Sequence, residues 1–326
     1  QVDCSKLLKP GKNLIAVKVT RDFVKDIEDA DKVMEVAVTV PVTNKMLKDI
    51  AHGFYQGDPA GIWQPVKLTI TNQVKIEDVF IKPALDGATF DMTIKNHDGK
   101  KKQFAVNTEI TDHETGAVLY KGVALAKAQL KDGEENKFTF KVDGLKPRLW
   151  TPQHPNLYNF KFSVVEGKNE VADVKSILSG FRTFEVKDGL FYLNGNKYWL
   201  RGGNHTPFAL APNDLQLANT FMQLMKQGNI DVTRTHTTPW NQLWMGAADK
   251  NGIGVSFEGT WPWLMIHSTP IPDANLLELW RSEYLSLLKN YRNHPSLLFW
   301  TINNEMKFYD LDSDTERTKK KFRIIS

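Results

Sequence analysis

The sequence has almost no cysteine, no long apolar run and no concentrated charge. Cys4 is its one cysteine, so no disulfide can form within the chain and the redox compartment is left open. No apolar stretch approaches the ~20 residues that a membrane-spanning helix needs. Basic residues are scattered with a net charge of +4, and the run Lys319 to Lys321 is typical of a solvated surface. We therefore expect no nucleic acid and no membrane as a partner.

What is present is typical of a soluble globular protein. Hydrophobic residues make up 41% of the sequence and charged residues 25%. At 326 residues the chain can form two or three domains, each with its own core. A periplasmic or secreted location is favoured over the cytoplasm, although the residues leave the compartment undetermined.

Residues 1–72 form the first predicted domain. Apolar and polar residues alternate at Asn13 to Val19, Glu35 to Val40 and Val66 to Ile70, which predicts half-buried strands. A loop rich in glycine and proline, Gly57 to Pro65, precedes the last of them. The pattern indicates a β-rich domain.

Residues 73–184 form the second predicted domain, in which short strands recur about every ten residues. Roughly seven strands in about 100 residues are typical of an immunoglobulin-like sandwich. The clearest strands are Val79 to Ile81, Thr89 to Ile94, Phe104 to Ile110, Lys137 to Val142 and Phe160 to Val165. No chemistry is assigned to this domain.

The third predicted domain, residues 185–326, opens with a hairpin. Asn194-Gly195 suits a type I′ turn, in which both central residues have positive φ. Strands and helices then alternate, which indicates βαβ units and a parallel sheet. The predicted helices begin near Asn213 as N-cap, at Thr238 with Pro239 in the first position, and at Asp273. Gly228 and Gly252 end the first two helices. The predicted strands are Asp231 to Thr235, Ile253 to Phe257 and Leu297 to Ile302. This order predicts the first half of a (β/α)₈ barrel.

One stretch, Tyr291 to Glu305, carries the strongest functional signal. A helix ends at His294-Pro295, an apolar strand follows, and Asn303, Asn304 and Glu305 come where that strand ends. Catalytic groups of a parallel barrel project from the carboxyl ends of its strands, so a carboxylate here is a candidate for chemistry. The alternative is an ordinary polar loop or helix cap after a strand.

The stretch consists of Arg292-Asn-His-Pro-Ser296, then the strand containing Trp300, and then Asn304-Glu305. As a whole it resembles the acid/base signature of the family 2 glycoside hydrolases. That family includes β-galactosidases, β-glucuronidases, β-mannosidases and exo-glucosaminidases. Gly57 to Val66 and Gly180 to Arg201 resemble the family's jelly-roll domain and barrel entry. Gln64-Pro65 departs from the family, because many members carry a substrate-binding Asp there. The resemblance implies a partial jelly roll, an immunoglobulin-like sandwich and half a barrel.

The resemblance also implies a retaining, exo-acting β-glycosidase that needs no cofactor. Glu305 would be the general acid/base, with its pKa raised by burial and a neighbouring negative charge, and Asn304 would bind the sugar 2-hydroxyl. The family's nucleophile is a Glu on a later barrel strand, about the seventh, and this sequence has no counterpart. We therefore expect a partial chain, with a missing segment or a second chain completing the barrel. The sugar and the oligomeric state are left open.

Five further residues are weaker candidates for substrate binding. Arg234 and His236 match family residues that orient the nucleophile and contact a sugar hydroxyl, with a salt bridge at the barrel rim as the alternative. His205 follows the first strand, and a structural role is equally open. Glu258 matches an acidic position that binds Mg²⁺ in some members, but one Glu is poor evidence, so no metal is predicted. Trp261 could stack on a sugar or pack under a lid. Trp300, inside the last predicted strand, is expected to be an aromatic side chain of the barrel floor beneath the site.

A rival interpretation is a catalytically incomplete carbohydrate-binding or structural fragment of a larger hydrolase. A binding protein that had lost catalysis would have no need of an intact Asn304-Glu305 pair. Retention of the pair therefore favours the enzyme.

Overall fold

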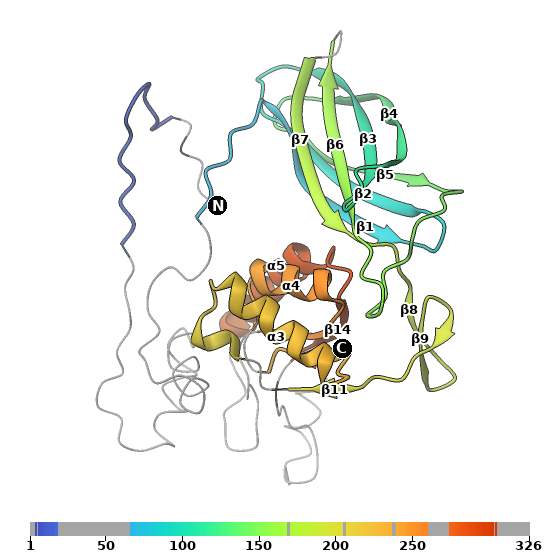
Figure 1. Ribbon diagram of the computed structural model, residues 1–326. Helices are drawn as coiled ribbons and strands as arrows, with labels where there is room; N and C mark the ends of the chain where they lie inside the picture. The colour runs from blue at the N-terminus through green and yellow to red at the C-terminus, as the bar shows by residue number, and fades with distance from the viewer. Residues whose placement is uncertain are drawn as a thin grey trace.

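The computed structural model describes Cys4, residues 6–18, 66–167, 170–204, 207–236, 239–259 and 274–302, and Asn304. Within these residues, a β-sandwich is followed by a small hairpin and then by a parallel sheet with helices (Figure 1). The fold class predicted from the sequence is confirmed for the sandwich and for the half barrel.

The sandwich contains the predicted seven strands, arranged in two antiparallel sheets. One sheet has the order β1-β2-β5, and the other has the order β4-β3-β6-β7. The strands are β1 (Val74–Pro83), β2 (Ala88–Asn96), β3 (Lys102–Asp112), β4 (Val118–Leu130), β5 (Glu135–Val142), β6 (Tyr158–Glu166) and β7 (Glu170–Ser179). Strands β1 and β7 are therefore edge strands of opposite sheets, and both bond to Asn293, which precedes β14.

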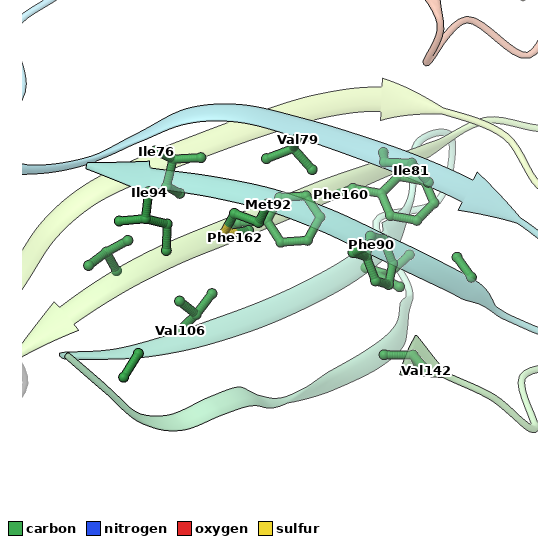
Figure 2. Close-up of a cluster of buried hydrophobic side chains, with 14 of the residues drawn as sticks. Ile76, Val79, Ile81, Phe90, Met92, Ile94, Val106, Val142, Phe160 and Phe162 are labelled. Carbon is green, nitrogen blue, oxygen red and sulfur yellow. The ribbon is translucent and has the colours of Figure 1, made fainter. Parts of the chain in front are cut away.

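Aromatic and branched side chains fill the space between the two sheets. Figure 2 shows Phe90 and Met92 of β2 pointing toward Phe160 and Phe162 of β6. The ring of Phe90 lies 5.3 Å from that of Phe162 and 6.0 Å from that of Phe160. Alternate residues of each strand face this space, which is the pattern that predicted the strands.

A small antiparallel sheet of three strands, which we call the hairpin, connects the sandwich to the parallel sheet. Its strands are β8 (Phe184–Lys187), β9 (Leu190–Leu193) and β10 (Asn196–Lys197). Asn194 has φ 52° and Gly195 has φ 77°, so the predicted turn with two positive φ angles is confirmed. The rings of Phe184 and Phe191 pack edge-on against Phe299, which places the hairpin at the parallel sheet.

Four parallel strands form the barrel half in the order β11-β12-β13-β14. They are β11 (Gly202–Gly203), β12 (Val232–Arg234), β13 (Gly254–Glu258) and β14 (Leu297–Thr301), connected through η1 (Pro207–Leu210), α3 (Leu215–Gln227), α4 (Gln242–Asn251) and α5 (Ala274–Tyr291). Sequential strands are neighbours, as in a (β/α)₈ barrel. All four carboxyl ends therefore lie at one edge of the sheet.

Helix α3 starts near Asn213 as predicted, but its N-cap and the start of α4 were predicted wrongly. Asp214, not Asn213, is the N-cap of α3, because its carboxylate accepts from the backbone N–H of Leu217. Helix α4 begins after Asn241, whose side chain caps Trp244 N, so Pro239 lies outside the helix. Gly228 and Gly252 end α3 and α4 as predicted. Asp273 lies outside the described residues.

Two strands predicted near the N-terminus are not formed within the described residues. Residues 12–18 and 66–70 belong to no ladder, and Leu14 and Ile70 are 96% and 86% exposed. An alternating pattern becomes a strand only where another strand satisfies its backbone groups, and no described segment does so here. The third predicted strand, Glu35 to Val40, lies outside the described residues, so the jelly-roll domain and all three domain boundaries stay predictions.

Candidate active site

Three polar side chains meet where three consecutive barrel strands end. The Arg234 guanidinium, at the end of β12, donates from Nε to Glu258 Oε2 at the end of β13, at 2.9 Å, and its Nη2 lies 2.8 Å from the same oxygen. Its Nη2 also donates to Asn304 Oδ1 at 2.6 Å, just after β14. We call Arg234, Glu258 and Asn304 the arginine cluster. Sequence reasoning predicted each of the three singly, and the fold brings them together.

The arginine cluster is largely removed from solvent. The Glu258 side chain is fully buried and Asn304 is 4% exposed, whereas the Arg234 side chain is 33% exposed. A buried carboxylate is tolerated when a cation and hydrogen bonds compensate its lost hydration. The predicted alternative for Arg234, a salt bridge at the barrel rim, is thus formed, and it holds the guanidinium at the strand ends.

Backbone contacts fix the position of Glu258. Its N–H donates to the hydroxyl of Thr235, at 2.7 Å, and Thr235 N donates to Ser256 O. Thr235 is 1% exposed and follows Arg234 directly. The strands β12 and β13 are therefore tied together beside the ion pair, which lowers the freedom of the Arg234 and Glu258 side chains.

Tyr284 of α5 supports the cluster from behind. Its ring packs where Gly259 leaves room, since a Cβ there would lie 2.6 Å from two ring carbons. Burial, together with the negative charge of Glu258, raises the pKa of Tyr284 to about 12, so the phenol stays neutral. Gly259 N donates to Thr301 O at 3.1 Å, and this contact joins the ends of β13 and β14.

One side chain of β14, that of Trp300, faces a different side of the sheet from the one predicted. Trp300, expected beneath the site, packs instead against Phe257 and Tyr284 on the helix side of the sheet. Phe299 packs on the hairpin at the other side. The two neighbouring side chains thus face opposite sides of the sheet, as residues of a strand do.

The Arg292 to Ser296 part of the signature lies at the opposite end of β14 from Asn304. Asn293 bonds to β1, and His294 Nδ1 lies 2.5 Å from Asp249 Oδ2. Ser296 N donates to Asp249 Oδ1 at 3.1 Å. These signature residues are thus separate from the arginine cluster, although they are close to it in sequence.

The other predicted site residues either lie outside the arginine cluster or are not among the described residues. His236 lies two positions beyond the end of β12 and is partly buried. Glu305, His205 and Trp261 lie outside the described residues, and their predicted roles stay predictions. Thr235, Gly259 and Tyr284 were missed, because their contribution depends on contacts between strands and helices that no local pattern reveals.

Neither a metal group nor a membrane helix is found in the described part of the chain. There, no three His, Cys, Asp or Glu side chains are arranged to hold a metal ion. No described helix is both long and apolar enough to cross a membrane. A cavity of about 410 Å³ lies between the sandwich and β14, lined among others by Phe80, Arg182 and Trp300, and it shares no residue with the arginine cluster.

The arginine cluster is chemically suited to hydroxyl-rich ligands. A guanidinium held in place by a carboxylate keeps N–H groups in fixed directions, and a primary amide offers both donor and acceptor. Grouped polar side chains at the carboxyl ends of parallel strands are where barrel enzymes bind and convert their substrates. Fold and site together define the class: half of a parallel (β/α)₈ barrel that follows an immunoglobulin-like sandwich and groups polar side chains at its strand ends.

Comparison with known families names the group more closely. Residues 74–182 match the family profile described as "Glycosyl hydrolases family 2", and residues 184–321 match that of "Glycosyl hydrolases family 2, TIM barrel domain". These two segments take up most of the chain. The chain belongs to glycosyl hydrolase family 2.

Curated relatives are consistent with this assignment. A β-galactosidase of Priestia megaterium is 27% identical over 332 residues, covering 94% of this chain and 29% of the relative. A β-galactosidase of Alteromonas mediterranea is 26% identical over 259 residues, covering 76% of this chain and 24% of the relative. The chain thus spans less than a third of the length of these relatives.

Solved structures share the fold. A Bacteroides uniformis β-glucuronidase superposes with a TM-score of 0.59 at 22% identity, over 78% of this chain and 30% of its own. A β-glycosidase from Bacteroides vulgatus gives a TM-score of 0.61 at 23% identity, over 81% of this chain and 33% of its own. At this identity the likeness establishes the fold and not the substrate.

Proposed function

We propose that this chain supplies the acid/base half of a retaining, exo-acting β-glycosidase. The observation that carries the proposal is the arginine cluster, in which Arg234 bonds to Asn304 at the carboxyl end of β14. Asn304 precedes Glu305 in the sequence, and the string around them resembles the family's acid/base signature. Membership of family 2 supports a β-glycoside as the substrate class.

The proposed mechanism uses two carboxyl groups on opposite sides of the anomeric carbon. Glu305, protonated, gives its proton to the glycosidic oxygen while a nucleophilic Glu attacks the anomeric carbon, so that the bond to the leaving group breaks and a glycosyl-enzyme forms. Glu305 then takes a proton from water, which attacks the anomeric carbon and frees the nucleophile. The product keeps the β configuration.

Residues of the arginine cluster would hold the sugar during both steps. Asn304 would bind the 2-hydroxyl, a contact that strengthens in the transition state. Arg234 would hold Asn304 in place and orient the nucleophile. His236, His205 and Trp261 would contact the sugar around the reacting bond. The nucleophile itself would come from a segment outside these 326 residues.

The first experiment is the intact mass of the natural protein, compared with the 37.1 kDa of this chain. The natural protein is then assayed on 4-nitrophenyl β-glycosides, beginning with the galactoside and glucuronide that the relatives' names suggest, followed by the mannoside and glucosaminide. We expect a larger mass and hydrolysis of one glycoside with retained configuration.

Variants assign the role of Glu305. We expect Glu305→Gln to lower kcat by on the order of 10²-fold to 10⁴-fold, because hydrolysis of the glycosyl-enzyme loses its general base. Added azide should restore part of the rate, because an anionic nucleophile needs no general base. Glu278→Gln is the control, since Glu278 is an exposed residue of α5. A mass equal to this chain with no hydrolysis would instead support a binding or structural fragment.

A further inference from the structure

The connection between α5 and β14 binds the sandwich to the barrel half. We call residues 292–297 the docking segment. It contains most of the string that identified the family, yet it lies at the end of β14 away from the arginine cluster. Its polar groups bond to β1, β7 and α4, so the signature has a structural consequence separate from proton transfer.

Asn293 pairs with the sandwich as a neighbouring strand would. Its side-chain amide donates to Val79 O at 2.8 Å, and its Oδ1 accepts from Ile81 N at 2.9 Å. Strand β1 is an edge strand, so these two backbone groups have no ladder partner on that side. The short Asn side chain satisfies both, which a longer or apolar side chain would not do.

The backbone of Asn293 reaches the second sheet as well. Ser179 Oγ, at the end of β7, donates to Asn293 O at 2.7 Å. Strand β7 is the edge of the four-stranded sheet, whereas β1 is the edge of the three-stranded one. A single residue of the docking segment is therefore fixed to both sheets of the sandwich.

Contacts of Arg292 and Arg182 hold the docking segment before and after Asn293. Arg292 forms an ion pair with Asp78, and its guanidinium carbon lies 4.4 Å from the centroid of the Phe80 ring. Arg182, which follows the last sandwich strand, donates from Nε to Pro295 O at 3.0 Å and from Nη2 to Leu297 O. The first carbonyl of β14 is thus held by the sandwich side of the interface.

From these contacts we infer that Asn293 is a positioning residue for the active site. Strand β14 has five residues and spans ~17 Å, with the docking segment at one end and Asn304 just past the other. A strand anchored at its start has a fixed position in the sheet, which sets where Asn304 meets Arg234. Glu305 is the next residue in the sequence. The inference rests on the proposed function of Glu305.

The test uses the natural protein carrying Asn293→Ala and two aryl glycosides of the sugar that the wild type hydrolyses. A phenyl leaving group needs protonation, whereas 2,4-dinitrophenolate leaves without it. We expect kcat/KM on the phenyl glycoside to fall by on the order of 10-fold or more, and by only about 2-fold on the dinitrophenyl glycoside, because a misplaced acid affects the first reaction alone. Ser179→Ala, which removes one hydrogen bond, should act in the same direction and more weakly.

Lys226→Met is the matched control. Lys226 Nζ donates to Pro152 O at 2.7 Å, so the variant also removes a contact between sandwich and barrel half, but it leaves the docking segment intact. We expect no difference between the two leaving groups for this variant. Hydrogen exchange of residues 297–304 should become faster in Asn293→Ala and stay unchanged in Lys226→Met.

Three results would overturn the inference. Equal losses on both glycosides would mean that Asn293 contributes to folding only. Unchanged exchange in residues 297–304 would mean that the docking segment does not fix β14, whatever the activity. A leaving-group effect of the same size in Lys226→Met would show that any contact between the domains suffices. Failure of the proposed function has a different signature, because the wild type would then hydrolyse neither glycoside.

Discussion

The guanidinium of Arg234 donates a 2.6 Å hydrogen bond to the side-chain oxygen of Asn304, 70 positions further along the chain. Glu258, from the strand between them, accepts from the same guanidinium. One cation therefore joins three consecutive strands at the edge where barrel enzymes carry their chemistry. The bond makes the geometry of the Asn304 amide depend on an ion pair.

Removing the Arg234 cation should lower the free energy of unfolding. Arg234→Met leaves the fully buried Glu258 carboxylate without its guanidinium, and we expect unfolding free energy to fall by about 3 kcal/mol in urea titrations. The double variant with Glu258→Gln should recover a large part of this loss, because it removes the stranded charge. Arg281→Met is the control, since its partner Glu278 is exposed; a loss of similar size there would contradict the explanation.

A methyl group at Gly259 should disturb the support of the cluster. Its Cβ would lie 2.6 Å from the Tyr284 ring, so we expect Gly259→Ala to lower stability by about 2 kcal/mol through overpacking. Combining it with Tyr284→Leu should restore part of the loss. Gly246→Ala in α4, where the new Cβ meets nothing within 4 Å, should raise the thermal midpoint instead. An unchanged midpoint in Gly259→Ala would refute the close approach.

Acid should weaken the sandwich through Asp91. Hydrogen bonds from Lys137 and Lys82 hold the pKa of this carboxyl well below its usual range, with Thr139 adding a third. A carboxyl whose folded pKa is lowered contributes stability that is present above its unfolded pKa, about 4, and is lost as pH falls below it. Asp91→Asn should therefore cost ~1 kcal/mol at pH 7, because both lysines are partly exposed, and should flatten the decline between pH 5 and pH 2.

The control for Asp91 is Asp143→Asn. Asp143 pairs with Lys141 at 3.0 Å, but its side chain is 50% exposed against 9% for that of Asp91. Thermal unfolding followed by circular dichroism at each pH compares the two variants. If both variants lose stability in parallel over the whole range, the acid sensitivity does not arise at Asp91.

Trp150 should couple the sandwich to the barrel half. Its indole N–H donates to Asp249 O at 2.9 Å, and its side chain is fully buried. We expect Trp150→Phe to lower stability by about 2 kcal/mol, from the lost hydrogen bond and the smaller ring. Trp199→Phe, at a side chain that is 82% exposed, should change stability by less than about 0.5 kcal/mol. Equal effects of the two would rule out a coupling role for the indole.

Local patterns carried the prediction of elements further than that of side-chain roles. Alternation gave the sandwich strands, and the Asn194-Gly195 pair gave its turn, because both depend on residues adjacent in sequence. Helix starts were displaced by up to a few residues, since several side chains near Asn213 and Pro239 can cap. Trp300 was assigned the wrong face, because its contacts with Phe257 and Tyr284 depend on how the strand packs against α5.

The sequence by itself determined the strands of the sandwich, the succession of strands and helices after it, and the family to which the chain belongs. Periodicity and capping act over a few residues, and the string around Asn304 is contiguous. Only the tertiary structure decided that Arg234 bonds to both Glu258 and Asn304, and that Asn293 bonds to Val79 and Ile81. These contacts join residues 24 to 214 positions apart. Their partners are chosen by strand order and domain packing, which depend on the whole fold and not on any local pattern.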